Sequence, residues 1–78
     1  MTIIDLCAAY DVADKAFRAG NAKGFPVGGN AEYVRLNVAE TSARNAIAKN
    51  VELAMAQRQL NVLAYFAAWA IMRGGFKP

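Results

Sequence analysis

The sequence contains no histidine and only one cysteine, Cys7, among its 78 residues. Without histidine, the chain lacks the most common general base and the usual partner of a nucleophilic serine or cysteine. A single cysteine excludes an intrachain disulfide and supplies too few ligands for a structural zinc site. We therefore expect no enzyme activity, no metal site and no cofactor. We interpret Cys7 as a packing residue, because reactive cysteines need an electropositive and accessible site.

Carboxylates that could pair as acid and base are also scarce. Asp11 and Asp14 are three residues apart and could pair in principle. Each is also followed four residues later by a basic residue, Lys15 or Arg18, at the spacing of an exposed helical ion pair. We interpret both carboxylates as solvated charges on a helix surface.

Charge of either sign is limited: nine lysines and arginines oppose six acidic residues, for a net charge of +3. This mild excess is compatible with an acidic protein partner, an anionic ligand or nucleic acid, and it selects none of them. The basic residues at positions 35, 44, 49 and 58 fall at scattered angles around a helix, which does not favour sequence-specific DNA binding.

Long hydrophobic runs are absent too. The apolar run at residues 60–72 contains one asparagine and is shorter than the roughly 18 residues of a candidate membrane span. Asp5 interrupts the N-terminal segment, so no signal peptide is expected. A lone cysteine is typical of a reducing compartment. We expect a cytoplasmic protein with no membrane span.

Residues 2–19 have the pattern of a first helix. Thr2 can serve as N-cap, with Asp5 three residues later in a capping-box arrangement, and Gly20 is the expected C-cap. The predicted apolar stripe, at helical spacing, consists of Ile3, Leu6, Tyr10, Ala13 and Phe17.

Glycine and proline are both absent from residues 31–73. A single helix of that length would extend about 65 Å, more than twice what the first helix could cover. Either the helix breaks, with Thr41–Ser42 and Asn50 as candidate N-caps, or chains pair to bury it. A coiled-coil-like seam at 3,4 spacing contains Lys49 and otherwise apolar residues, namely Ala46, Leu53, Ala56, Leu60, Leu63, Ala67 and Ala70.

Residues 60–72 carry a second apolar surface, so this helix would be apolar on all sides. Such a helix must be buried on all sides, and a monomer of this size offers little cover. We therefore predict a homo-oligomer whose interface contains Leu53, Leu60, Leu63, Tyr65, Phe66 and Trp69. The aromatic members of this set could instead belong to the core of the single chain, or form a binding patch for another protein.

The glycine-rich loop at residues 20–30 is the strongest candidate ligand site. Gly28 and Gly29 lead into Asn30, a predicted N-cap, and exposed N–H groups at a helix N-terminus bind anions. No GK[ST] follows and no strand precedes the loop, so it is neither a P-loop nor a dinucleotide fingerprint. The predicted anion site comprises Lys23, Phe25, Gly28, Gly29, Asn30, Tyr33 and Arg35. The alternative is a plain connector between helices.

These patterns predict one all-α domain over residues 1–78: an N-terminal helix, a glycine-rich loop and a long helix, whole or broken, in a homo-oligomeric bundle. The first functional hypothesis is a helical interaction protein that binds and modulates a partner protein, in the style of accessory or inhibitor proteins of phages and mobile elements. The alternative is an oligomer that sequesters a phosphorylated, nucleotide-like small molecule at the loop. A third hypothesis is an assembly protein of a larger particle.

Overall fold

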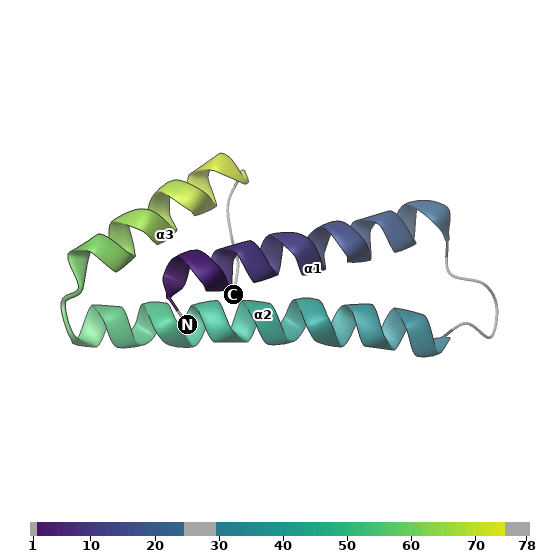
Figure 1. The fold of residues 1–78 in the computed structure, drawn as a ribbon, viewed down its shortest axis with the longest axis horizontal. Coiled ribbons are helices and arrows are strands. Elements are labelled where there is room, and N and C mark those ends of the chain that lie inside the picture. Colours follow the sequence, from purple (N-terminus) through teal and green to yellow (C-terminus); the bar gives the residue numbers. More distant parts are fainter. Residues whose placement is uncertain (1, 25–29, 75–78) are drawn as a thin grey trace.

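The computed structural model describes residues 2–24 and 30–74, which form three helices and no strand. Helix α1 spans Ile3–Lys23, α2 spans Asn30–Ala56 and α3 spans Leu60–Met72. Helices α1 and α2 lie antiparallel, and α3 turns back beside the N-terminal half of α1 (Figure 1). The all-α prediction is confirmed. Residues 25–29 of the predicted loop lie outside the described part of the chain.

Helix α1 begins as its sequence predicts. The Thr2 hydroxyl accepts a hydrogen bond from the Asp5 backbone N–H at 3.2 Å, and the Asp5 carboxylate accepts one from the Thr2 backbone N–H at 3.2 Å. The predicted end at Gly20 is wrong, because α1 continues to Lys23. Gly24 follows with a φ of 76°, in the left-handed region that glycine adopts without steric cost. An interior glycine costs only about 1 kcal/mol, so packing against α2 can carry the helix past Gly20.

The core lies between α1 and α2, close to the N-terminus of α1. Ile3, Cys7 and Tyr10 surround Ile47 of α2, whose side chain is completely buried. Cys7 is 1% exposed, as expected of a packing residue, and burial is the main cause that raises the pKa of its thiol. Partly buried residues from all three helices pack around this cluster, namely Leu6, Ala43, Val51, Val62, Phe66 and Trp69.

Helix α2 is continuous through Thr41–Ser42 and Asn50, so the chain breaks at neither of the two candidate positions. Ile47 lies between these positions and is the most deeply buried residue of the core. Its packing against α1 keeps the segment helical, because tertiary contacts override the local preference of capping residues.

The actual break lies at residues 57–59. Arg58 has a φ of 56°, a left-handed conformation that costs a residue with a Cβ about 1–2 kcal/mol. The Gln59 backbone N–H donates to the Ala54 carbonyl at 2.8 Å, and that of Arg58 donates to the Met55 carbonyl at 3.3 Å. These two bonds form a Schellman turn with arginine in the position that glycine normally occupies.

Candidate functional site

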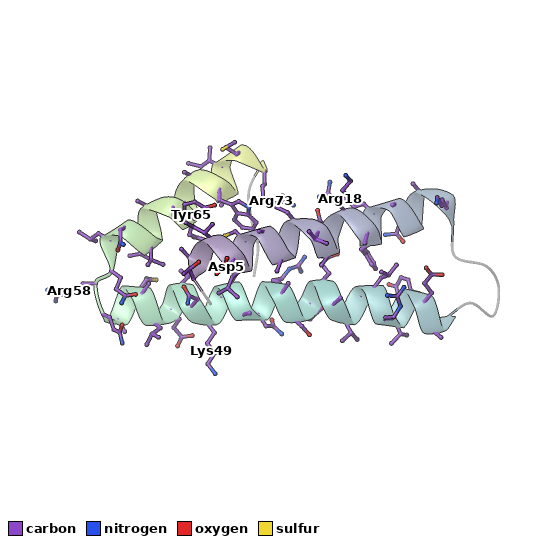
Figure 2. All side chains as sticks on the ribbon, in the orientation of Figure 1. Asp5, Arg18, Lys49, Arg58, Tyr65 and Arg73 are labelled. Carbon is purple, nitrogen blue, oxygen red and sulfur yellow. The ribbon has the colours of Figure 1, made fainter. Side chains whose placement is uncertain are left out.

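An arginine at the end of α3 connects this helix to α1. The Arg73 guanidinium forms ion pairs with Asp11 and with Asp14, the second at 2.9 Å between Nη2 and Oδ2. The Trp69 indole N–H donates to the Asp11 carboxylate at 3.2 Å. The guanidinium carbon also lies 5.1 Å from the ring centroid of Tyr10 and 5.0 Å from that of Trp69. We call Arg73, Trp69, Asp11 and Asp14 the Arg73 cluster; Figure 2 shows Arg73 at the end of α3, facing α1.

A second arginine reaches the same tyrosine from α2. Arg44 donates from Nη2 to Glu40 at 2.7 Å and to the Tyr10 hydroxyl at 3.4 Å. The hydrogen bond with Tyr10 is the main cause that raises the pKa of Arg44. The Tyr10 ring also meets the Trp69 ring edge-on, with 5.6 Å between centroids. All three helices therefore meet at Tyr10 through polar and aromatic contacts.

The carboxylates of this region are held by cationic donors. Asp14 is only 7% exposed, so its interpretation as a solvated charge is wrong. Its predicted pair with Arg18 is confirmed at 3.0 Å, whereas Asp11 pairs across the fold with Arg73. Oxygen atoms occupied by guanidinium and indole donors suit the joining of helices better than proton transfer to a substrate.

Two signals in the sequence could have located the Arg73 cluster. Asp14 continues the 4,3,4 spacing of the buried residues Ile3, Cys7 and Tyr10. Arg73 likewise follows Trp69 at the spacing of the half-buried face of α3. Opposite charges in the inward registers of two helices predict an ion pair between them, because a charge is rarely buried without a partner.

The opposite side of α3 is apolar and exposed. No residue of α3 is buried, and Leu60, Ile71 and Met72 are 74%, 77% and 87% exposed. We define the outer face of α3 as five exposed residues that share one side of the helix at 3,4 spacing: Leu60, Ala64, Ala67, Ala68 and Ile71. Side chains project from α3 away from α1 and α2 (Figure 2).

The predicted oligomer-interface residues lie on different sides of the molecule. Phe66 and Trp69 are half-buried and pack against the core, with 6.0 Å between their ring centroids. Leu53 and Leu60 are exposed, Tyr65 is 38% exposed and Leu63 is half-buried. Two of the six residues therefore stabilise the single chain. The role of the set in an oligomer stays a prediction.

The predicted anion site falls largely outside the described residues: Phe25, Gly28 and Gly29 are not described, nor is the side chain of Asn30. Lys23 is exposed in the last turn of α1. Tyr33 packs on Phe17 with 5.6 Å between ring centroids, and Arg35 lies 3.8 Å from Glu32. The gathering of these residues around a phosphate therefore stays a prediction.

Two further observations concern possible ligand and metal sites. A shallow depression of about 280 Å³, lined by Lys49, Glu52, Leu53 and Ala56, lies near the end of α2. Within residues 2–24 and 30–74, no group of three carboxylate or thiol side chains could hold a metal ion.

No protein family, curated protein or solved structure matches this chain. None of the three described helices has both the length and the apolar character needed to cross a membrane. The surface chemistry of the helices is therefore the basis for a proposal about function.

Proposed function

We propose that this protein is a small helical interaction protein that binds a partner protein through the outer face of α3. The observation that carries this proposal is the exposure of five apolar residues on one side of α3. Leu60 and Ile71, at its two ends, are both about three-quarters exposed. A contiguous apolar patch on a small protein marks an interaction site more often than scattered apolar residues do.

The shape of the outer face favours a helical partner. Three alanines, Ala64, Ala67 and Ala68, lie between the larger side chains of Leu60 and Ile71. Small side chains allow a second helix to approach closely, and the larger ones at each end can fit between its side chains. Arg58 is exposed immediately before α3 and can pair with a carboxylate at the rim of the partner, which helps to set orientation.

Self-association is the second part of the proposal. Exposed Leu53 and Leu60 lie on either side of the break between α2 and α3, and they are 53% and 74% exposed. Burial of these side chains against a second copy would stabilise a dimer by roughly 25 cal/mol for each square ångström of apolar surface covered. We propose a homodimer that buries Leu53 and Leu60 and leaves the rest of each outer face, from Ala64 to Ile71, available to another protein.

The test places a photo-cross-linking phenylalanine analogue at Ile71 and, as a matched control, at Val12. Val12 is 72% exposed and lies on α1, outside the outer face. In cells that express the chain natively, we expect one dominant adduct with another protein from position 71 and none from position 12. Equal adduct patterns from the two positions would contradict the proposal. A ladder of self-adducts would favour the assembly-protein hypothesis instead.

A further inference from the structure

The break between α2 and α3 is not explained by the residues that form it. Gln57, Arg58 and Gln59 are all good helix formers, and Arg58 adopts a left-handed conformation that is costly for any residue with a Cβ. Gln59 is the N-cap of α3 but makes no side-chain hydrogen bond to its first turn. The local sequence therefore favours one continuous helix, and the contacts of α3 with the rest of the fold must hold the bend.

Those contacts are few and lie on one side of α3. Val62, Phe66 and Trp69 pack against the core cluster, and Arg73 closes the far end by pairing with Asp11 and Asp14. Nothing in this set requires that α3 and α1 belong to the same chain. An α3 from a second copy would present the same side chains to the same α1.

If residues 57–59 were helical, α2 and α3 would form one continuous helix, and the relative directions of their inward sides would be fixed by the helical repeat. At 100° per residue, the inward residues of α2 and α3 fall within an arc of about 120° on a continuous helix, and Arg58 lies within the same arc. On α2 these inward residues are Ile47, Val51 and Ala54, and on α3 they are Val62, Phe66 and Trp69. Leu53 and Leu60 occupy a different side, two turns apart, on either side of the break. A continuous helix would therefore offer one inward side and a separate apolar contact centred on the break.

We propose that α3 is exchanged between two copies of the chain. In the exchanged dimer, residues 57–59 straighten, α2 and α3 form one helix, and each α3 packs on α1 of the other copy. Arg73 of one copy then pairs with Asp11 and Asp14 of the other, while Leu53 and Leu60 are buried where the two long helices cross. Exchange of an identical element preserves the contacts of α3 with the core and with α1, and only the turn hydrogen bonds of Arg58 and Gln59 are replaced by helical ones. Relief of the Arg58 conformation and the new crossing contact therefore drive association. The inference rests on the proposed self-association and specifies how the two copies join.

The first test changes the free energy of the left-handed conformation at residue 58. Arg58→Gly makes the left-handed turn easy and the continuous helix unfavourable, so the closed monomer should prevail. Arg58→Ala is the matched control, because it removes the same charge and side chain but retains a Cβ. By native mass spectrometry over a dilution series, Arg58→Gly should raise the dimer dissociation constant by about 100-fold or more, and Arg58→Ala should leave it close to wild type. Equal dissociation constants for the two variants would overturn the exchange.

The second test uses charge complementation. One chain carries Asp11→Lys with Asp14→Lys, and the other carries Arg73→Glu; circular dichroism checks that each is helical. Neither chain can form the Arg73 cluster within itself or with its own copies, but an exchanged heterodimer of the two restores opposite charges at both sites. We expect the heterodimer to dominate the mixture, whereas random 1:2:1 mixing would overturn the exchange.

Failure of the exchange and failure of self-association give different results. If Arg58→Gly leaves the dimer dissociation constant unchanged while Leu60→Ser dissociates the dimer, the exchange is overturned and side-by-side self-association is supported. A monomer at every concentration would overturn both, and the cross-link at position 71 would still decide whether another protein binds.

Discussion

Helices α1 and α3 both pack against α2, but they are held in different ways. Helix α1 starts with a capping box and contributes three apolar residues to the buried core. Helix α3 starts without a side-chain cap, has no buried residue and follows a left-handed arginine. A helix with few buried contacts is the part of a fold that opens first. The comparison therefore identifies the α1–α2 hairpin as the stable unit and α3 as the element available for other contacts.

In α1 and α3, the hydrophobicity of the helix does not match the burial of its residues. Helix α3 contains no charged residue, yet none of its residues is buried. Helix α1 is mixed in composition, yet it holds the deepest contacts, including the buried carboxylate of Asp14. Apolar surface that the chain leaves uncovered at this size favours a role in binding over a role in the core.

The largest expected effect comes from the α1–α2 core. Ile47→Ala should lower the free energy of unfolding by about 2–4 kcal/mol, because Ile47 is fully buried and the cavity would lie at the centre of a thin core. Ile71→Ala on the outer face of α3 is the control, with an expected change within about 0.5 kcal/mol. Urea unfolding followed by circular dichroism measures both. A cost at Ile71 as large as that at Ile47 would mean that the outer face is covered in solution.

The second effect is confined to α3. Arg73→Met should remove the ion pairs with Asp11 and Asp14. It should lower the free energy of unfolding by about 1–3 kcal/mol, because the buried Asp14 carboxylate keeps only its exposed partner Arg18. Amide hydrogens of α3 should then exchange faster, while those of the α1–α2 hairpin should keep most of their protection. The matched control is Arg18→Met, because Arg18 also pairs with Asp14 but its side chain is 76% exposed.

Cys7 provides an independent readout of the same opening. Val62, Phe66 and Trp69 of α3 pack against the cluster that contains Cys7. Burial and then the Asp11 carboxylate raise the pKa of this thiol, and Arg73 offsets part of that rise, so removing Arg73 from a closed structure would leave less thiolate and slow its reaction. Faster labelling of Cys7 in Arg73→Met would therefore report exposure of the thiol. Unchanged or slower labelling would contradict the view that Arg73 holds α3 closed.

The helices and the start of α1 were predictable because they depend on nearby residues. Helical periodicity and the Thr2–Asp5 capping box act within one or two turns, and both are present in the structure. The break was not predictable from the same rules: Asn50 has the better capping chemistry, yet the chain bends at Arg58. Packing of Ile47 and the docking of α3 decide the position of the break, and both are tertiary effects.

The Arg73 cluster could be predicted from the sequence only in part, for the same reason. Opposite charges at Asp14 and Arg73 occupy inward registers, which the spacing could indicate, but which two helices meet depends on the direction of the chain after residue 59. The prediction from sequence assigned Phe66 and Trp69 to an oligomer interface, and it did not anticipate the Arg73 cluster for this reason. Once α3 turns back on α1, these two aromatic residues have partners inside the chain.

A smaller effect distinguishes the starts of α1 and α3. Thr2→Ala should cost about 1 kcal/mol, because it removes the side-chain acceptor for the Asp5 backbone N–H. Gln59→Ala is the control at the start of α3, where the N-cap side chain makes no such bond, and should change stability by less than about 0.5 kcal/mol. Thermal unfolding at a fixed protein concentration measures both. Equal losses would mean that α3 is capped in solution as firmly as α1.

The smallest effect is the acid response of the α1 start. Hydrogen bonds from the Thr2 backbone N–H and then from its hydroxyl lower the pKa of the Asp5 carboxyl below its ordinary value. A lowered pKa contributes stability that is present above the unfolded pKa of about 3.9 and is lost as pH falls through the folded pKa. A carboxyl-detected NMR titration should place the Asp5 pKa below that ordinary value. Thr2→Ala should shift it only part of the way back, because the backbone hydrogen bond, which is the larger cause of the lowered pKa, remains. A full return in Thr2→Ala would show that the hydroxyl dominates, and an ordinary pKa in the wild type would show that the capping box is not formed in solution.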